Sequence, residues 1–182
     1  MRVGRQSWVW RFTAGLVSAV ALHLWAAALW GQPFAYVANL DSDAISVIDA
    51  GRNRVLTTID LEGCGDGCAP VDVAVSPDGS RVYVVNQDAD SVMAIDAATL
   101  EMTTIAMPEC ASVGGCTPTG IAVRPDGEVL YVTAFATSTV VVIDTVGNAV
   151  TGETALGDGI FRPTDVAFAR SGGFAYVANQ RA

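Results

Sequence analysis

The chain of 182 residues contains no lysine and a single histidine, His23. The histidine lies inside an apolar N-terminal segment, so the rest of the chain has neither side chain. For that part, Ser-His-Asp and Cys-His catalysis, Schiff-base chemistry, histidine-ligated metals and covalent c-type haem attachment are excluded. Any catalysis would depend on carboxylates, arginine, tyrosine, hydroxyl groups or a hard cation. This lack argues against an enzyme.

Positive charge is also scarce, because the chain has ten arginines but nineteen acidic residues. All the acidic residues lie after residue 40, whereas Arg2, Arg5 and Arg11 lie at the N-terminus. Beyond that segment, seven arginines against nineteen acidic residues leave a net charge of −12. Such a surface repels phosphate backbones, so we expect no nucleic-acid binding. The charge favours solubility, with a cation-binding or high-salt surface as the alternative.

Residues 1–31 have the sequence pattern of an export segment. A basic start is followed by a nearly continuous apolar stretch from Phe12 to Trp30, with small residues at 26–28. This pattern predicts a secretory signal cleaved after Ala28. An uncleaved membrane anchor is the alternative, because about 20 apolar residues can span a bilayer. Both interpretations place the remaining chain in the periplasm, outside the cell or on its surface, and only the anchor gives membrane contact.

Residues 32–182 contain an internal repeat. The stretch Pro70–Asp96, PVDVAVSPDGSRVYVVNQDADSVMAID, returns as PTGIAVRPDGEVLYVTAFATSTVVVID at Pro118–Asp144. It begins again at Pro163–Asn179, and its second half already appears at Phe34–Asp49. The tyrosines at 36, 83, 131 and 176 are 47, 48 and 45 residues apart. Strand-forming repeats of roughly 40–50 residues are typical of propeller blades.

Alternating apolar positions and PDG-type turns predict strands in groups of three, four, four and two. The predicted strands are 34–39, 45–49 and 55–61; 71–75, 82–86, 91–96 and 101–107; 120–123, 129–133, 139–144 and 150–156; and 164–168 and 174–179. The predicted fold class is therefore all-β, a β-propeller of four-stranded blades with about three blades and a partial one. Since closed propellers have four to eight blades, we expect an incomplete ring. It would be a piece of a longer propeller or, alternatively, half of a dimer that closes through its open edges.

The blocks YVAN at 36–39, YVVN at 83–86, YVTA at 131–134 and YVAN at 176–179, with their PDG turns and V-x-x-ID strands, resemble the YVTN-type β-propeller repeats. That family includes surface-layer and secreted propeller proteins and is similar to the lactonase-like propellers. The resemblance covers nearly everything after Gln32. It implies a secreted, non-catalytic binding or scaffold module for a protein, a glycan or a small ligand. The alternatives are a lactonase-like hydrolase with a carboxylate or cation site at the channel mouth, and an accessory propeller of a redox enzyme.

The four cysteines occupy equivalent loops between successive blades. Behind an export signal disulfides are expected, and three pairings are possible. We favour the nearest pairing, Cys64 with Cys68 and Cys110 with Cys116, because each pair lies in one glycine-bearing loop. A four-thiolate metal site is the alternative, although the spacing departs from the usual zinc knuckle.

Acidic residues recur in two of the turns and at three strand ends. Asp41 with Asp43 and Asp88 with Asp90 could offer oxygen ligands to calcium, the one cofactor we consider, or could form Asx-turns. The repeated aspartates at strand ends are expected to accept backbone N–H bonds in the next turn. These are Asp49, Asp96 and Asp144.

Asp72 and Asp165 begin the innermost strands of two blades, and Gly120 takes this place in another. In a propeller such positions lie near one end of the central channel. Two carboxylates there could hold a cation or act as acid and base. Alternatively, each is a solvated or N–H-bonded structural aspartate.

Overall fold

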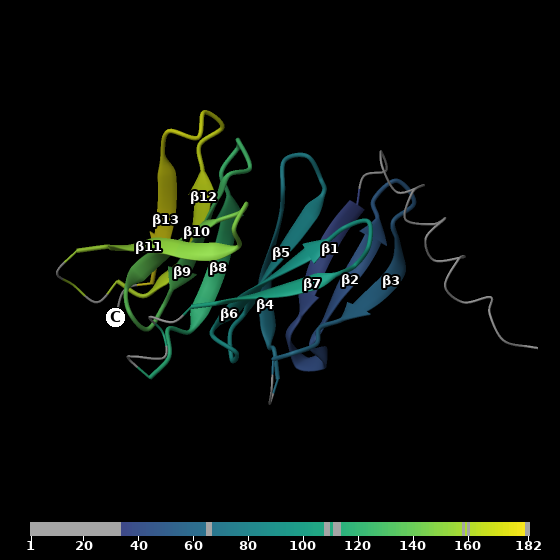
Figure 1. The fold of residues 1–182 in the computed structure, drawn as a ribbon, viewed down its shortest axis with the longest axis horizontal. Coiled ribbons are helices and arrows are strands. Elements are labelled where there is room, and N and C mark those ends of the chain that lie inside the picture. Colours follow the sequence, from purple (N-terminus) through teal and green to yellow (C-terminus); the bar gives the residue numbers. More distant parts are fainter. Residues whose placement is uncertain are drawn as a thin grey trace, which may run out of the picture.

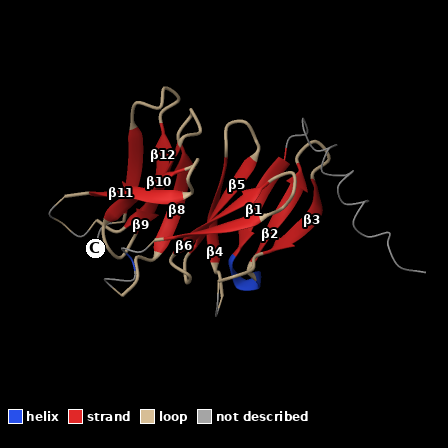
Figure 2. Ribbon diagram, viewed as in Figure 1, coloured by secondary structure: helices blue, strands red, loops and turns tan. Residues whose placement is uncertain are grey.

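The computed structural model describes residues 34–180, except 65–66, 108–109, 111–113, 158 and 160. The predicted export segment 1–31 lies outside the described residues. Within the described part, none of the helical segments has the length and apolar character needed to cross a membrane. The described residues are almost entirely strands and turns, with one short 3-10 helix, η1 (Leu40–Ser42), as Figure 2 shows.

The strands form four antiparallel sheets that stand side by side (Figure 1). We call these sheets blades 1 to 4. Blade 1 contains β1 (Phe34–Asn39), β2 (Ala44–Asp49) and β3 (Arg54–Asp60). Blade 2 contains β4 (Pro70–Val75), β5 (Arg81–Asn86), β6 (Ser91–Asp96) and β7 (Met102–Ala106). Blade 3 contains β8 (Pro118–Val123), β9 (Val129–Ala134), β10 (Thr139–Asp144) and β11 (Ala149–Ala155). Blade 4 contains β12 (Pro163–Phe168) and β13 (Ala175–Asn179).

The first strands of the blades lie together at the inner side of the molecule. β4 lies beside β8, and β8 lies beside β12; β1, which corresponds to the second strand of the other blades, also contacts β4. Strand order within each sheet then follows the sequence outward, as in the blades of a propeller. The predicted all-β class and the grouping of three, four, four and two strands are confirmed. Within the described residues, β1 pairs only with β2, and β13 only with β12.

Each inner strand begins at a proline, earlier than the sequence pattern predicted. Pro70, Pro118 and Pro163 open β4, β8 and β12, and a register irregularity follows each of them. Proline has no N–H to donate and is tolerated at the first position of a strand. The residue before each proline has a positive φ: Ala69 47°, Thr117 52° and Arg162 44°. The same sharp reversal therefore turns the chain into each inner strand.

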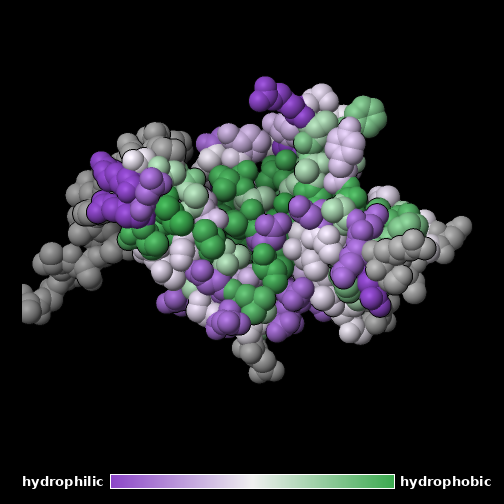
Figure 3. All heavy atoms as spheres, turned by 180° about the vertical axis from the view of Figure 1, so that it is seen from behind, coloured by the Kyte–Doolittle hydropathy of each residue, from purple (hydrophilic) through white to green (hydrophobic). Residues whose placement is uncertain are grey.

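The tyrosines of the first three repeats pack against the following blade. Tyr36 packs against the apolar cluster shared by blades 1 and 2, and Tyr83 belongs to the core between blades 2 and 3. Tyr131 meets Phe168 of blade 4, with ring centroids 4.8 Å apart. Tyr176 occupies the same position in blade 4 and is 67% exposed. Seen from behind, apolar residues are concentrated over the middle of the molecule (Figure 3).

Candidate functional site

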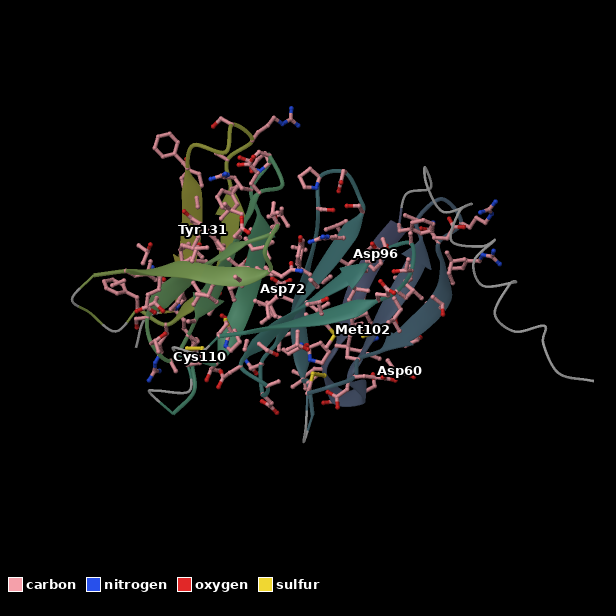
Figure 4. All side chains as sticks on the ribbon, viewed as in Figure 1. Asp60, Asp72, Asp96, Met102, Cys110 and Tyr131 are labelled. Atoms are coloured by element: carbon pink, nitrogen blue, oxygen red, sulfur yellow. A yellow bond between two sulfur atoms is a disulfide. The ribbon has the colours of Figure 1, made fainter. Side chains whose placement is uncertain are left out.

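Asp72 lies in the middle of the molecule, on inner strand β4 (Figure 4). One carboxylate oxygen, Oδ2, accepts the N–H of Ile121 in blade 3 at 2.9 Å, and Oδ1 accepts the N–H of Val73 at 2.8 Å. Burial raises the pKa of Asp72; the two amide bonds oppose this, and the negative charge of Asp165 adds to it. The carboxylate thus connects blades 2 and 3. Its burial destabilises the ionised form relative to the protonated form.

Asp165 is the corresponding residue of β12, and its Oδ1 accepts the N–H of Val166 at 2.8 Å. It is exposed, whereas Asp72 is half-buried. Between them in ring order lies Gly120, where an added Cβ would come within 2.8 Å of the Cα of Asp165. The structure therefore brings both predicted carboxylates to one end of the inner strands. Their hydrogen-bond partners are backbone amides, as expected for structural aspartates.

The second aspartate of each acidic turn forms a clamp between blades. Oδ1 of Asp43 accepts the N–H groups of Cys68 and Ala69, at 2.8 and 2.7 Å. Oδ1 of Asp90 accepts those of Cys116 and Thr117, at 3.0 and 2.9 Å. Both aspartates have positive φ, which a short polar side chain tolerates well. Each clamp holds the loop that leads into the next inner strand.

Two disulfides lie in these clamped loops. The structure joins Cys64 to Cys68 and Cys110 to Cys116, which is the nearest pairing. No cysteine of the described chain is free, so the alternative four-thiolate site is not formed. Cys110 and Cys116 are buried in the core between blades 2 and 3, whereas Cys64 is half-buried.

The third inter-blade loop has no cysteine and uses different groups. Oγ of Ser138 accepts the N–H of Phe161 at 3.1 Å, in the position where the first two clamps use aspartate. The Phe161 ring lies over Gly157 and Gly159. Arg162 places its guanidinium carbon 5.7 Å from the centre of the Phe135 ring. No residue of this loop was predicted to have a function from the sequence, although the lack of cysteines distinguishes it from the other two loops.

A shallow hollow of about 450 Å³ lies beside this third clamp. It is lined by the turn at 135–138, by Ala155, Gly157 and Gly159, and by Arg162. Hydroxyl groups, an aromatic ring and a guanidinium therefore meet at a half-open surface. Such a set can bind polar or aromatic groups of a partner without any catalytic step.

The remaining predicted residues are spread over separate turns. Within the described part of the chain, no three His, Cys, Asp or Glu side chains converge on a point that could hold a metal ion. Asp41 and Asp88 are exposed, and Asp43 and Asp90 serve the clamps. The calcium hypothesis therefore has no third ligand in the described residues.

The aspartates at the strand ends accept turn amides, as predicted. Asp49 accepts the N–H of Arg52, and Asp96 accepts those of Ala98 and Thr99. Asp144 accepts the N–H of Gly147. The Arg52 guanidinium, 2.7 Å from Asp49, also lowers the pKa of that carboxyl group.

The blades and their inner strands define a β-propeller protein. Residues 30–160 match the family model described as a domain of unknown function, DUF5074, and the chain belongs to this family. No functionally curated protein matches the chain.

Solved structures of similar fold include three that are informative. Hydrazine synthase of Kuenenia stuttgartiensis is 31% identical, with a TM-score of 0.55 over 65% of this chain and 31% of that one. A streptogramin B lyase is 16% identical, with a TM-score of 0.66 over 80% and 44%. A catalytically inactive histidine-to-alanine variant of Staphylococcus aureus virginiamycin B lyase with quinupristin is 15% identical, with a TM-score of 0.64 over 81% and 48%. The chain thus spans about a third to a half of these proteins, and the two lyases show the fold alone.

Proposed function

We propose that the chain is an exported β-propeller module of the YVTN-repeat type that binds a partner molecule rather than converting a substrate. The observation that carries this proposal is that the carboxylates of the inner strands and clamps are hydrogen-bonded to the backbone. Asp72, Asp43 and Asp90 each accept two backbone N–H groups, and in each case at least one belongs to a loop or strand of the following blade. Displacing such a group would break hydrogen bonds between blades, which suits a fixed scaffold better than an acid–base pair.

The binding surface that the geometry favours is the edge formed by the three inter-blade loops and their clamps, which we call the loop edge. Two of its loops are held by disulfides and aspartates, and the third adds the hollow beside Arg162. Rigid loops bind with a small loss of conformational entropy. The two disulfides are consistent with an oxidising compartment, which supports the export expected for residues 1–31. The partner would be a protein, a glycan or a small ligand.

The hydrolase alternative is tested with the exported chain and a panel of lactones and p-nitrophenyl esters. We expect no turnover above the buffer rate, either for the unmodified protein or for the Asp72→Asn/Asp165→Asn double variant. Turnover by the unmodified protein that disappears in the double variant would instead establish a lactonase-like hydrolase.

The binding role is tested by cross-linking in the native compartment, followed by titration of the purified partner. Arg162→Glu, in the hollow, should weaken that binding by about tenfold or more. Arg170→Glu is the matched control, because this exposed arginine lies in the turn after β12, away from the hollow. Equal affinities of both variants would contradict the loop-edge surface.

An accessory role beside a redox enzyme is the second candidate. It is favoured by the 31% identity with part of a hydrazine synthase. In this case, material that co-purifies with the tagged chain from its native compartment should contain a redox-active chromophore, seen in its visible absorption spectrum. Co-purifying partners without any redox-active chromophore would contradict this candidate and leave the binding role intact.

A further inference from the structure

The third clamp has the backbone of the other two, but its turn offers a hydroxyl group in place of a carboxylate. Asp43, Asp90 and Ser138 occupy the same place in their turns and have similar positive φ values of 48°, 43° and 56°. The side chain of each accepts a hydrogen bond from the loop that leads into the next inner strand. The first two clamps therefore show which group this backbone arrangement binds, namely a carboxylate.

In the first two clamps, one carboxylate oxygen accepts two successive backbone amides. The second amide belongs to Ala69 in one loop and to Thr117 in the other. The corresponding amide of the third loop is that of Arg162. Ser138 Oγ accepts only the N–H of Phe161, and within the described residues the N–H of Arg162 has no acceptor. The third loop thus keeps available an amide that the other two loops donate to a carboxylate.

We propose that the third clamp binds the carboxylate group of a small molecule, in the place that an aspartate side chain takes in the other two clamps. This inference rests on the proposed binding role and names the chemical class of its ligand. The ligand carboxylate would accept the N–H of Arg162. It would also accept the O–H of Ser138, because a hydroxyl group that accepts one bond can still donate another.

Arg162 also supplies the positive charge that such a ligand needs. Its equivalents in the other loops, Ala69 and Thr117, are uncharged. The guanidinium group lines the hollow and lies 5.7 Å from the centre of the Phe135 ring, and among the described residues it forms no ion pair. Its planar fork of N–H groups matches the two oxygens of a carboxylate. Compared with the other two clamps, the third lacks one negative charge and gains one positive charge.

The charge of the rest of the chain limits what kind of acid can bind. Beyond the N-terminal segment, seven arginines against nineteen acidic residues leave a net charge of −12. This field repels polyanions such as acidic polysaccharides or acidic peptides. One carboxylate on an otherwise uncharged molecule meets less repulsion, and the hollow offers room for the rest of that molecule. The features of the site therefore favour a small monocarboxylate.

The test is an NMR titration of the full ¹⁵N-labelled chain, exported so that its disulfides form, with sodium acetate at constant ionic strength. We expect the amide signal of Arg162 to shift saturably, with a dissociation constant of about 1–50 mM. The amides of Ala69 and Thr117 are internal controls and should not move, because Asp43 and Asp90 already accept them. Sodium sulfate should bind more weakly. Glucuronate and N-acetylglycine then show whether a sugar acid or an amino acid is the tighter source of the carboxylate.

Two variants test the parts of the site separately. Ser138→Asp restores the carboxylate of the other clamps and should weaken acetate binding by about tenfold or more, because its own side chain takes the site. Ser171→Asp is the matched control: it adds the same charge in an exposed turn at the other end of β12, and should bind acetate as the unmodified chain does. Arg162→Gln should weaken binding by about tenfold, since it loses the charge-assisted hydrogen bonds.

Three results would overturn the inference. One is an Arg162 amide signal that does not shift saturably with acetate. Another is sulfate that binds as tightly as acetate. The third is a Ser138→Asp variant that is folded, by its circular-dichroism melt, and binds acetate as tightly as the unmodified chain. The proposed function itself fails on a different measurement, the turnover of lactones or esters, so the two failures are distinguishable.

Discussion

Gly120 shows how a single residue is dictated by its neighbour across a blade interface. Its equivalents in the adjacent inner strands are Asp72 and Asp165, yet a Cβ at Gly120 would lie 2.8 Å from Cα of Asp165 and 3.0 Å from the carbonyl oxygen of Thr164. Backbone atoms cannot move aside as a flexible side chain does. The missing side chain at this position is therefore required by packing between blades 3 and 4.

We expect Gly120→Ala to lower the free energy of unfolding by about 1–3 kcal/mol, the usual cost of overpacking. The measurement is urea denaturation. Gly152→Ala is the control, because its Cβ would meet no atom within 4 Å and alanine suits a strand better than glycine. It should leave stability unchanged within about 0.5 kcal/mol or raise it slightly. Similar losses in both variants would contradict the packing argument.

The pKa of Asp72 offers a second test at the scale of residues. Burial raises this pKa and the charge of Asp165 raises it further. We therefore expect Asp165→Asn to lower the pKa of Asp72, as measured by carboxyl NMR titration. Asp78→Asn is the control: that residue lies in the turn after β4, where bonds from the Ser76 hydroxyl and from Ser80 lower its own pKa to about 2. It should leave the Asp72 titration unchanged.

The sign of the linked stability change follows from the same shift. Because the folded-state pKa of Asp72 lies above its unfolded value, its contribution favours folding at low pH and is lost as the pH rises through the folded pKa. Removing the charge of Asp165 should make that loss smaller. A pKa of Asp72 that does not respond to Asp165→Asn would show that burial alone sets it.

Among the elements, the inter-blade loops separate what the sequence could predict from what it could not. Strand alternation and the PDG turns are local signals, so all thirteen described strands lie within about two residues of their predicted places. The roles of Asp43, Asp90 and Ser138 depend on amides more than 20 residues away. No local pattern encodes such pairs. In the third inter-blade loop, the Phe161 ring packs where the other two loops have a disulfide, and this too is visible only in three dimensions.

The two disulfides should differ in their contribution to stability. In a chain-entropy estimate, closing loops this short is worth about 2 kcal/mol each, so the loop term hardly distinguishes them. Burial does, because Cys110 and Cys116 are both buried in the core between blades 2 and 3, whereas Cys64 is half-buried. We expect the Cys110→Ala/Cys116→Ala variant to lose more unfolding free energy than Cys64→Ala/Cys68→Ala, in urea denaturation. The opposite order would contradict the argument from burial.

For the molecule as a whole, the repeat in the sequence predicted the class of fold, because the nearly equal spacing of four tyrosines leaves little choice of architecture. It could not predict how the carboxylates are used. Asp72 and Asp165 look equivalent in sequence, but only Asp72 has a following inner strand whose amide, Ile121, it can bind in the described structure. Chemical role here depends on which blade comes next.

This dependence on neighbours predicts a gradient of stability across the blades. Blade 2 is packed on both faces, and Val92, Met93 and Ile95 of β6 are fully buried, whereas β13 is largely exposed. In hydrogen exchange, we expect β6 amides to exchange only through global unfolding and β13 amides to exchange at least about 100-fold faster through local opening. Equal protection of β6 and β13 would mean that all the described blades unfold as one cooperative unit.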